Sequence, residues 1–237
     1  MKELKVSGIS VEVQKKNIKH AHLYVKPPDG HVTVSAPLAM KDKAIELFVR
    51  ANIAWLKTQI RRFQEQPRAD KRQYVSGETL YLWGKQYFLQ FEPSTRKNAL
   101  VFEGKRAILR MRAASTVAQR ERYVREQYRE ALKKEVRRLL PKWEQMTGLS
   151  AKEWRTKYMT TQWGICKEEA GRLWFNVQLA EKPPACLEYI ILHELLHLAE
   201  HRHNDRFVTM LDKYMPQWRE VRKTLNGLKL DWVEKEK

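Results

Sequence analysis

The sequence has few cysteines and no long apolar run. Its 237 residues include two cysteines, Cys166 and Cys186, which are too few for a disulfide framework or a cysteine-rich metal site. No stretch approaches the roughly 18 to 20 consecutive apolar residues of a transmembrane helix, so we expect no membrane partner. Residues 1–13 lack the apolar core and small-residue cleavage site of a secretory signal. These absences favour a cytoplasmic location and leave the oligomeric state undefined.

Positive charge is in excess. The chain has 46 Lys and Arg residues against 28 Asp and Glu residues, a formal net charge of +18. Such a charge attracts acidic partners, whether nucleic acid, nucleotides or acidic peptides, but it defines neither a fold nor an activity. The simpler alternative is a solvated, generically basic surface. Hydrophobic residues make up 43% of the chain, enough to build a folded core.

The first 114 residues are predicted to be rich in β-structure, with one helix. Apolar residues at helical spacing predict that helix over residues 41–65, and a polar break follows at 66–71. A turn is predicted at 27–30, where two prolines precede Asp and Gly. No internal repeat is detectable. Strands or hairpins are predicted at 6–13, 22–26, 31–37, 80–91 and 100–109.

Residues 115–237 change to a helical period. Apolar residues recur every three or four positions from Val124 to Trp143, which predicts one long helix, and Pro141 should kink or end it. We therefore predict an α+β protein with a β-rich region over residues 1–114 and a second domain over residues 115–237. Further strands and helices are expected at about 153–163, 172–177, 185–200, 204–214 and 217–225.

The segment from Ile190 to His203 carries the residues on which a chemical function depends. His193 and His197 are four residues apart in a helical pattern, so their side chains lie about 40° apart on one face, one turn apart. Two imidazoles in this arrangement can bind one zinc ion at about 2.0 to 2.1 Å. Glu194 lies about a quarter turn round the helix. From there its carboxylate can act as general base on a metal-bound water.

A catalytic zinc usually has three protein ligands and a water. His203 is the best third ligand, and the helix must end at about residues 199–200 for it to reach the ion. Glu200 and His201 are alternative ligands. The metzincin pattern has the same histidine spacing, but it has a glycine at the position of Glu200 and a Met-turn that this chain lacks. A helix with two solvated histidines is the structural alternative, and the density of histidine and glutamate over 193–203 argues against it.

An ordered set of residues around this motif resembles the YgjP-like metallopeptidase family, which is related to the SprT-like zinc peptidases. The resemblance runs from about Lys157 to Trp218. Where the family pattern has arginine and serine, this chain has Gln162 and Ile165. The set comprises Tyr-Met-Thr-Thr-Gln-Trp-Gly-Ile-Cys at 158–166, then Gly171, Asn176, Leu179 and Pro183, the histidine motif itself, and Asn204 to Phe207.

The resemblance implies a minimal gluzincin-like zinc metallopeptidase core over residues 115–237, with a backing helix, a small sheet and the zinc helix. It also implies that His193, His197 and His203 bind Zn²⁺ and that Glu194 is catalytic. Trp163 and Cys166 are interpreted as core residues, because tryptophan and free cysteine bury well. Asn176 is expected to brace a loop or, alternatively, to hold a ligand histidine in place.

We therefore predict a zinc-dependent hydrolase, in the first instance a metallopeptidase that acts on a peptide or protein through a zinc-bound water and Glu194. The peptide could lie along the sheet edge that precedes the zinc helix. A zinc-dependent hydrolase of nucleotide phosphoanhydrides is an alternative that suits the charge, although a glycine-rich phosphate loop is lacking. A basic nucleic-acid-associated protein with a structural zinc is another, but such a site has no use for Glu194 as a base.

Overall fold

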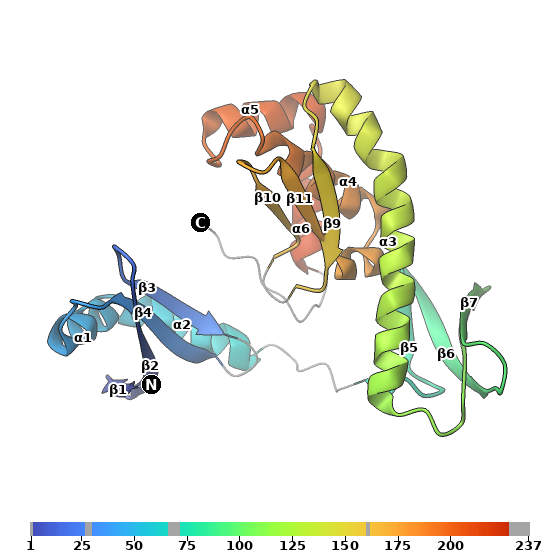
Figure 1. The fold of residues 1–237 in the computed structure, drawn as a ribbon, viewed down its shortest axis with the longest axis horizontal. Helices are drawn as coiled ribbons and strands as arrows, with labels where there is room; N and C mark the ends of the chain where they lie inside the picture. Colours follow the sequence, from blue (N-terminus) through green and yellow to red (C-terminus); the bar gives the residue numbers. More distant parts are fainter. Residues whose placement is uncertain (1, 27–29, 66–71, 160–161, 228–237) are drawn as a thin grey trace. The chain divides into compact units, whose positions relative to one another are not determined.

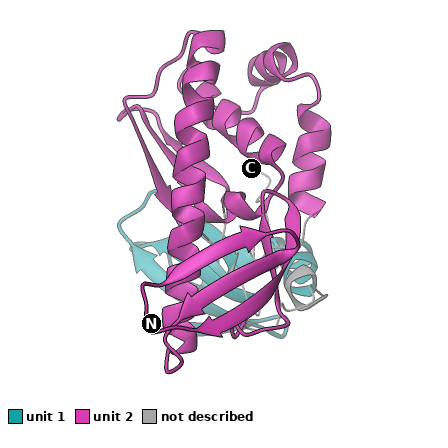
Figure 2. Ribbon diagram, turned by 90° about the vertical axis from the view of Figure 1, so that its right-hand side faces the viewer, with its two compact units in different colours: residues 1–70 teal, residues 71–237 magenta. Residues whose placement is uncertain are grey.

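The computed structural model describes residues 2–26, 30–65, 72–159 and 162–227. Within these ranges the chain forms three small sheets and six α-helices, which confirms the predicted α+β class. It divides into two compact units, residues 1–70 and residues 71–237 (Figure 2). None of the helices in the described part is long and apolar enough to cross a membrane.

The first unit is a four-stranded sheet packed against two helices. Valines that alternate along the strands form its core with Ile45, Val49 and Leu56 of the helices. The sheet order is β1-β2-β4-β3, and its central pair β2 and β4 is parallel while the outer pairs are antiparallel. The elements are β1 (Lys2–Val6), β2 (Ile9–Lys16), β3 (His22–Lys26), β4 (His31–Pro37), α1 (Asp42–Ala51) and α2 (Ile53–Glu65).

Two predicted elements of this unit are each divided in two. The strand predicted over 6–13 is confirmed for residues 9–13 within β2, but it does not run on from Val6, because Ser7 and Gly8 form a tight turn with φ of 50° and 82°. Positive φ at both central residues gives the two-residue turn whose twist matches antiparallel strands. The helix predicted over 41–65 is interrupted at Asn52, whose Nδ2 donates to the Phe48 carbonyl at 2.8 Å. The predicted turn at 27–30 and the break at 66–71 fall wholly or largely outside the described residues.

The second unit begins with a sheet of the same topology. Its order is β5-β6-β8-β7, again with a parallel central pair and antiparallel outer pairs. The turn between its first two strands also has positive φ at both residues, 53° at Trp83 and 77° at Gly84. The two four-stranded sheets therefore have the same topology although their sequences show no repeat. What they share is the geometry of the first turn and the positions of the inward-facing residues. The strands are β5 (Thr79–Leu82), β6 (Lys85–Pro93), β7 (Ala99–Glu103) and β8 (Arg106–Met111).

A long helix, α3 (Val117–Thr147), runs along the whole second unit (Figure 1). It begins with a capping box in which the Gln119 amide donates to Thr116 Oγ1 and the Thr116 amide donates to Gln119 Oε1. Pro141 does not end the helix, since the apolar side chains of Leu140 and Trp143 are buried on either side of it. Their burial offsets the hydrogen bond that proline removes.

The remaining elements pack beside the C-terminal part of α3. A three-stranded sheet has the order β10-β11-β9, with β9 and β11 parallel and β10 at the edge. The strand predicted over 153–163 is confirmed only for β9, and the short edge strand β10 was missed. These elements are β9 (Glu153–Lys157), β10 (Gly164–Lys167), β11 (Arg172–Asn176), the 3₁₀ helix η1 (Val177–Glu181), α4 (Pro184–Leu196), α5 (Asp205–Tyr214) and α6 (Trp218–Gly227).

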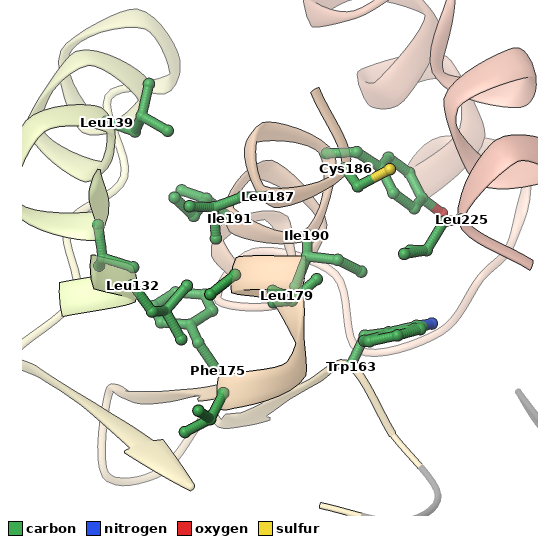
Figure 3. Packing of buried hydrophobic residues seen from close by; sticks show 14 of the residues in the cluster. Leu132, Leu139, Trp163, Phe175, Leu179, Cys186, Leu187, Ile190, Ile191 and Leu225 are labelled. Carbon is green, nitrogen blue, oxygen red and sulfur yellow. The ribbon is translucent and has the colours of Figure 1, made fainter. Parts of the chain in front are cut away.

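Helix α4 is the centre of the second unit. It contacts α3, α5, α6, η1, β10 and β11, and Figure 3 shows Leu187, Ile190 and Ile191 of this helix packed among side chains of the surrounding elements. A helix that is apolar on all faces is stable only when it is enclosed in this way. The backing helix, small sheet and histidine helix of the predicted core are therefore all present.

The division between the units differs from the predicted boundary at 114/115. The β5–β8 sheet shares one core with α3 and α4 through side chains such as Leu89 and Leu109. Its first turn also bonds to η1, because the Trp83 amide donates to the Ala180 carbonyl at 2.8 Å. A Cβ on Gly84 would lie 2.9 Å from Cγ of Pro183, so the turn requires a glycine there.

The burial of α4 leads to a stability prediction. Ile191 is fully buried in this helix, and Ile191→Ala should lower the free energy of unfolding of the second unit by about 2 to 5 kcal/mol. Met146 of α3 is 48% exposed, so Met146→Ala is the matched control and should change it by less than about 0.5 kcal/mol. Urea denaturation monitored by tryptophan fluorescence measures both. Equal effects of the two substitutions would contradict the central position of α4.

Candidate metal centre

The three predicted histidines are brought together by an early end to α4. The helix ends at Leu196 and His197 is its C-cap, a few residues before the predicted end. The amides of Ala199 and Glu200 both donate to the Leu196 carbonyl at 3.0 Å. This tight turn sends the chain back, so that His203 faces the other two histidines.

The Nε2 atoms of the three rings form a nearly equilateral triangle. Nε2 of His197 lies 3.3 Å from that of His193 and 3.1 Å from that of His203, and the third side is 3.0 Å. Ligands at 2.0 to 2.1 Å from a tetrahedral ion are about 3.3 to 3.4 Å apart. The triangle is thus close to the size that one small transition-metal ion requires. Of the three residues, His203 is exposed while the other two lie deeper.

The hydrogen bond of His197 also favours the tautomer of a metal ligand. Its Nδ1 lies 3.0 Å from the backbone carbonyl oxygen of Glu200. A carbonyl can only accept a hydrogen bond, so Nδ1 carries the proton and Nε2 of the neutral ring presents a lone pair to the other two rings. A backbone acceptor on the far nitrogen is the usual way in which a protein orients a metal-binding imidazole.

Phe207 forms the base of the cluster. It is 1% exposed, and its ring centroid lies 5.0, 4.7 and 4.9 Å from those of His193, His197 and His203. Asn204 positions it, because the Asn204 side chain accepts from the Phe207 amide at 3.0 Å and so begins α5 directly after His203. The three imidazoles therefore rest on one apolar ring, which limits their movement.

Glu194 lies beside the edge strand β10. Its side chain is buried, with 5% of the residue exposed, although it is charged and on the same helix as two of the histidines. A Cβ on Gly164 would lie 2.6 Å from Glu194 Oε1 and 2.5 Å from its Cγ, so the carboxylate occupies space that only glycine leaves. Within the described part of the chain, the ligand atoms that could together hold a metal ion come from the three histidines. Glu194 is not in this group.

Cys166 follows on the same face of β10 as Gly164, because side chains alternate along a strand. Burial, and then the carboxylates of Glu194 and Glu168, raise the pKa of its thiol to about 12. The thiol is not part of the group of ligand atoms that the three histidines form. Trp163, just before the strand, is buried in the core, as expected.

Asn176 braces the loop that leads into β10, which is the first of its two expected roles. It is fully buried, and its Nδ2 donates to the carbonyl oxygens of Met159 and Gln162, both at 2.8 Å. Gln178 adds another bond, with its Nε2 donating to the Met159 carbonyl at 2.7 Å. These bonds hold the backbone at Met159 and at Gln162, two residues before Gly164. Gln162 enters them through its backbone alone, so its departure from the family pattern leaves this brace intact.

The two alternative ligands are directed elsewhere. Glu200 accepts from the Arg202 amide at 3.2 Å and lies 3.9 Å from Arg206. His201 pairs with Glu168 of the β10–β11 turn at 2.5 Å. Sequence reasoning identified the three converging histidines and missed the roles of Phe207 and Gly164. The one available signal in the sequence for Phe207 was its position three residues after Asn204, the N-cap of α5.

Two comparisons with known proteins found a match. A family model described as the YgjP-like metallopeptidase domain matches residues 19–228, which extends the resemblance well beyond the motif region. Among solved structures, the chain is similar to the metallopeptidase zymogen abylysin of Pyrococcus abyssi, with 19% identity and a TM-score of 0.37, over 41% of this chain and 99% of that one. A search of curated proteins gave no match.

The convergence of the rings gives a prediction about metal content. Wild-type protein should hold about one divalent metal ion per chain, and His203→Ala should weaken binding more than about 100-fold, beyond the loss expected for an outer partner of a ligand. His201→Ala, two residues away and also exposed, is the matched control and should retain the ion. Inductively coupled plasma mass spectrometry after dialysis measures this. Loss in the control but not in His203→Ala would exchange the roles of the two residues.

Proposed function

The chain belongs to the YgjP-like metallopeptidase family, and from that premise we propose that it is a zinc-dependent peptidase whose general base is Glu194. The observation that carries this proposal is the close approach of three Nε2 atoms, 3.0 to 3.3 Å apart, beside a buried carboxylate that lies outside their cluster. Three imidazoles with one open position are the ligand set of a catalytic rather than a structural zinc.

In this proposal His193, His197 and His203 hold the zinc, and the exposed side of His203 faces the substrate. When bound, zinc lowers the pKa of a coordinated water towards about 7 and polarises a substrate carbonyl. Phe207 keeps bulk water away from the buried side of the three rings. The backbone bond from His197 to Glu200 keeps that ring in the tautomer that binds metal.

Glu194 carries the proton in both halves of the reaction. Its carboxylate removes a proton from the attacking water and, once the carbonyl carbon has been attacked, donates that proton to the amine that leaves. One water is consumed for each peptide bond. The position of Glu194 against Gly164 rather than among the histidine nitrogens supports this role, since a carboxylate bound to the ion could not carry a proton.

The substrate is proposed to add to β10. This strand pairs with β11 alone among the strands of the described ranges, so its other edge offers backbone donors and acceptors to an extended peptide. Gly164 and Cys166 of β10 lie on the Glu194 side of the strand. A peptide on this edge would therefore present its backbone carbonyls close to the carboxylate and the three histidines.

Replacement of the general base is the first test. Glu194→Gln should retain the metal but lower kcat by about 10² to 10⁴-fold, because an amide cannot take the proton. Glu188→Gln, on the same helix but partly exposed and paired with Lys142, is the control and should retain full activity. Cleavage of an unfolded protein substrate, with and without chelator, measures both. Undiminished turnover by Glu194→Gln would remove this residue from the mechanism.

The glycine beside the base gives a second test. In Gly164→Ala the new methyl group would lie within 2.7 Å of three Glu194 atoms, so the carboxylate must move. We expect kcat to fall up to about 100-fold with metal content unchanged, since a displacement of about 1 Å can have that effect. Gly227→Ala, where no atom lies within 4 Å of the added group, should be silent. Wild-type kcat in Gly164→Ala would show that the position of Glu194 is not limiting.

A further inference from the structure

A cavity of about 800 Å³ lies in the second unit, apart from the histidine cluster. It is bounded by the loop between β6 and β7, the end of β8 and the first turns of α3. Its lining includes four basic side chains, Arg96, Lys97, Arg112 and Arg122, against one carboxylate, that of Glu126. That carboxylate is already paired with Arg129. The charge that faces the cavity is therefore strongly positive.

Of these four cations, Arg122 lies on α3 and the others lie before it in the chain. They differ from five other basic residues of that helix, each of which is paired with a glutamate: Arg125, Arg129, Lys133, Arg138 and Lys142. For the four cavity residues, no carboxylate of the described residues lies within 4.0 Å. Four like charges around one hollow repel one another, and proteins usually intersperse the two signs on a surface.

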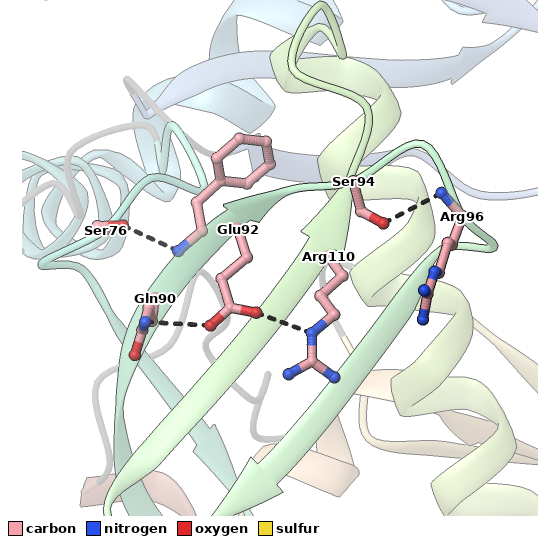
Figure 4. Close-up of polar contacts among 7 residues, drawn as sticks. Ser76, Gln90, Glu92, Ser94, Arg96 and Arg110 are labelled. Atoms are coloured by element: carbon pink, nitrogen blue, oxygen red, sulfur yellow. Dashed lines mark hydrogen bonds and ion pairs between the residues drawn. The ribbon is translucent and has the colours of Figure 1, made fainter.

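The contrast is clear at the end of β8. Arg110 is neutralised, because its Nε donates to Glu92 Oε2 at 2.8 Å (Figure 4). Arg112, two residues further on, lines the cavity with no such partner among the residues that the structure describes. Figure 4 also shows Arg96 on the loop that follows β6, away from the Glu92 pair.

The wall of the cavity is held in place by the fold. The Ser94 amide donates to the Met111 carbonyl at 2.8 Å and the Arg96 amide donates to Ser94 Oγ at 3.1 Å. At the other end of the loop, the Tyr123 hydroxyl donates to the Asn98 carbonyl at 2.8 Å. The loop that carries Arg96 and Lys97 is thus tied to both β8 and α3. At the start of α3, Gln119 lines the cavity and caps the helix together with Thr116.

We propose that this cavity binds a small ligand with two or three phosphate groups, of the size of a nucleoside diphosphate or triphosphate. One guanidinium group can donate two parallel hydrogen bonds to a phosphate group, and three of the four cations are arginines. The volume lies in the usual range for small-molecule sites, about 300 to 1,000 Å³. The Tyr123 ring and Met111 line the same cavity and give an apolar surface for the rest of the ligand.

The site is tested by calorimetric titration of the purified protein at about 0.15 M salt, which screens diffuse surface attraction. Inorganic triphosphate, ATP and a short oligothymidylate are titrated separately. The double variant Arg112→Ser with Arg122→Ser should weaken ATP and triphosphate binding at least about tenfold, because each lost residue removes charge-assisted hydrogen bonds. Lys105→Ser with Arg106→Ser is the matched control, since it removes the same charge from exposed residues at the opposite end of β8.

Four outcomes decide the question. A loss confined to the first double variant supports the proposal. Equal losses in both variants would assign the binding to net charge and overturn it, and so would absence of triphosphate and ATP binding by the wild type. Binding of oligothymidylate alone, lost in the first double variant, would assign the cavity to a nucleic-acid backbone instead. Unchanged ATP affinity in His203→Ala separates this site from the metal centre, so the result does not depend on the proposed peptidase activity.

Discussion

Burial of α4 on all its sides is the constraint from which the candidate site follows. A helix of this composition is stable only when α3, α5, α6 and two strands enclose it, and that enclosure determines which way each side chain of the helix points. Glu194 and the two histidines are the polar exceptions on its last turns. The histidines meet His203 where the helix ends, and the glutamate enters the space beside Gly164. The packing of the core thus determines where the polar side chains of the candidate site lie.

Several distant segments keep this arrangement in place. Asn176 and Gln178 hold the loop before β10, and the turn at Gly84 bonds to η1 and packs against Pro183, where α4 begins. The β5–β8 sheet therefore supports the start of the helix whose other end carries the histidines. The same strand order and the same tight turn recur at Ser7–Gly8 in the first unit, so one architectural plan is used twice.

Much of this could be read from the sequence, and the rest could not for identifiable reasons. Long apolar periodicity identified α3, and the spacing of His193 and His197 identified the helix that carries two of the three clustered histidines. The turn at Ser7–Gly8 was missed because the apolar alternation continues across it. Strand β10 was missed because it has only four residues. Its importance for the site comes from a contact with Glu194, which is about thirty residues away in the chain. Tertiary contacts of this kind leave no local periodicity.

The central claim is that three imidazoles share one metal ion while Glu194 stays outside its ligand set. X-ray absorption spectroscopy of the metal-loaded protein at the zinc edge tests this most directly. The account predicts three histidine nitrogens at about 2.0 to 2.1 Å with one further light atom from water. A sulfur at about 2.3 Å would bring Cys166 or Cys186 into the site. That result, or fewer than three imidazoles in the fit, would contradict the account.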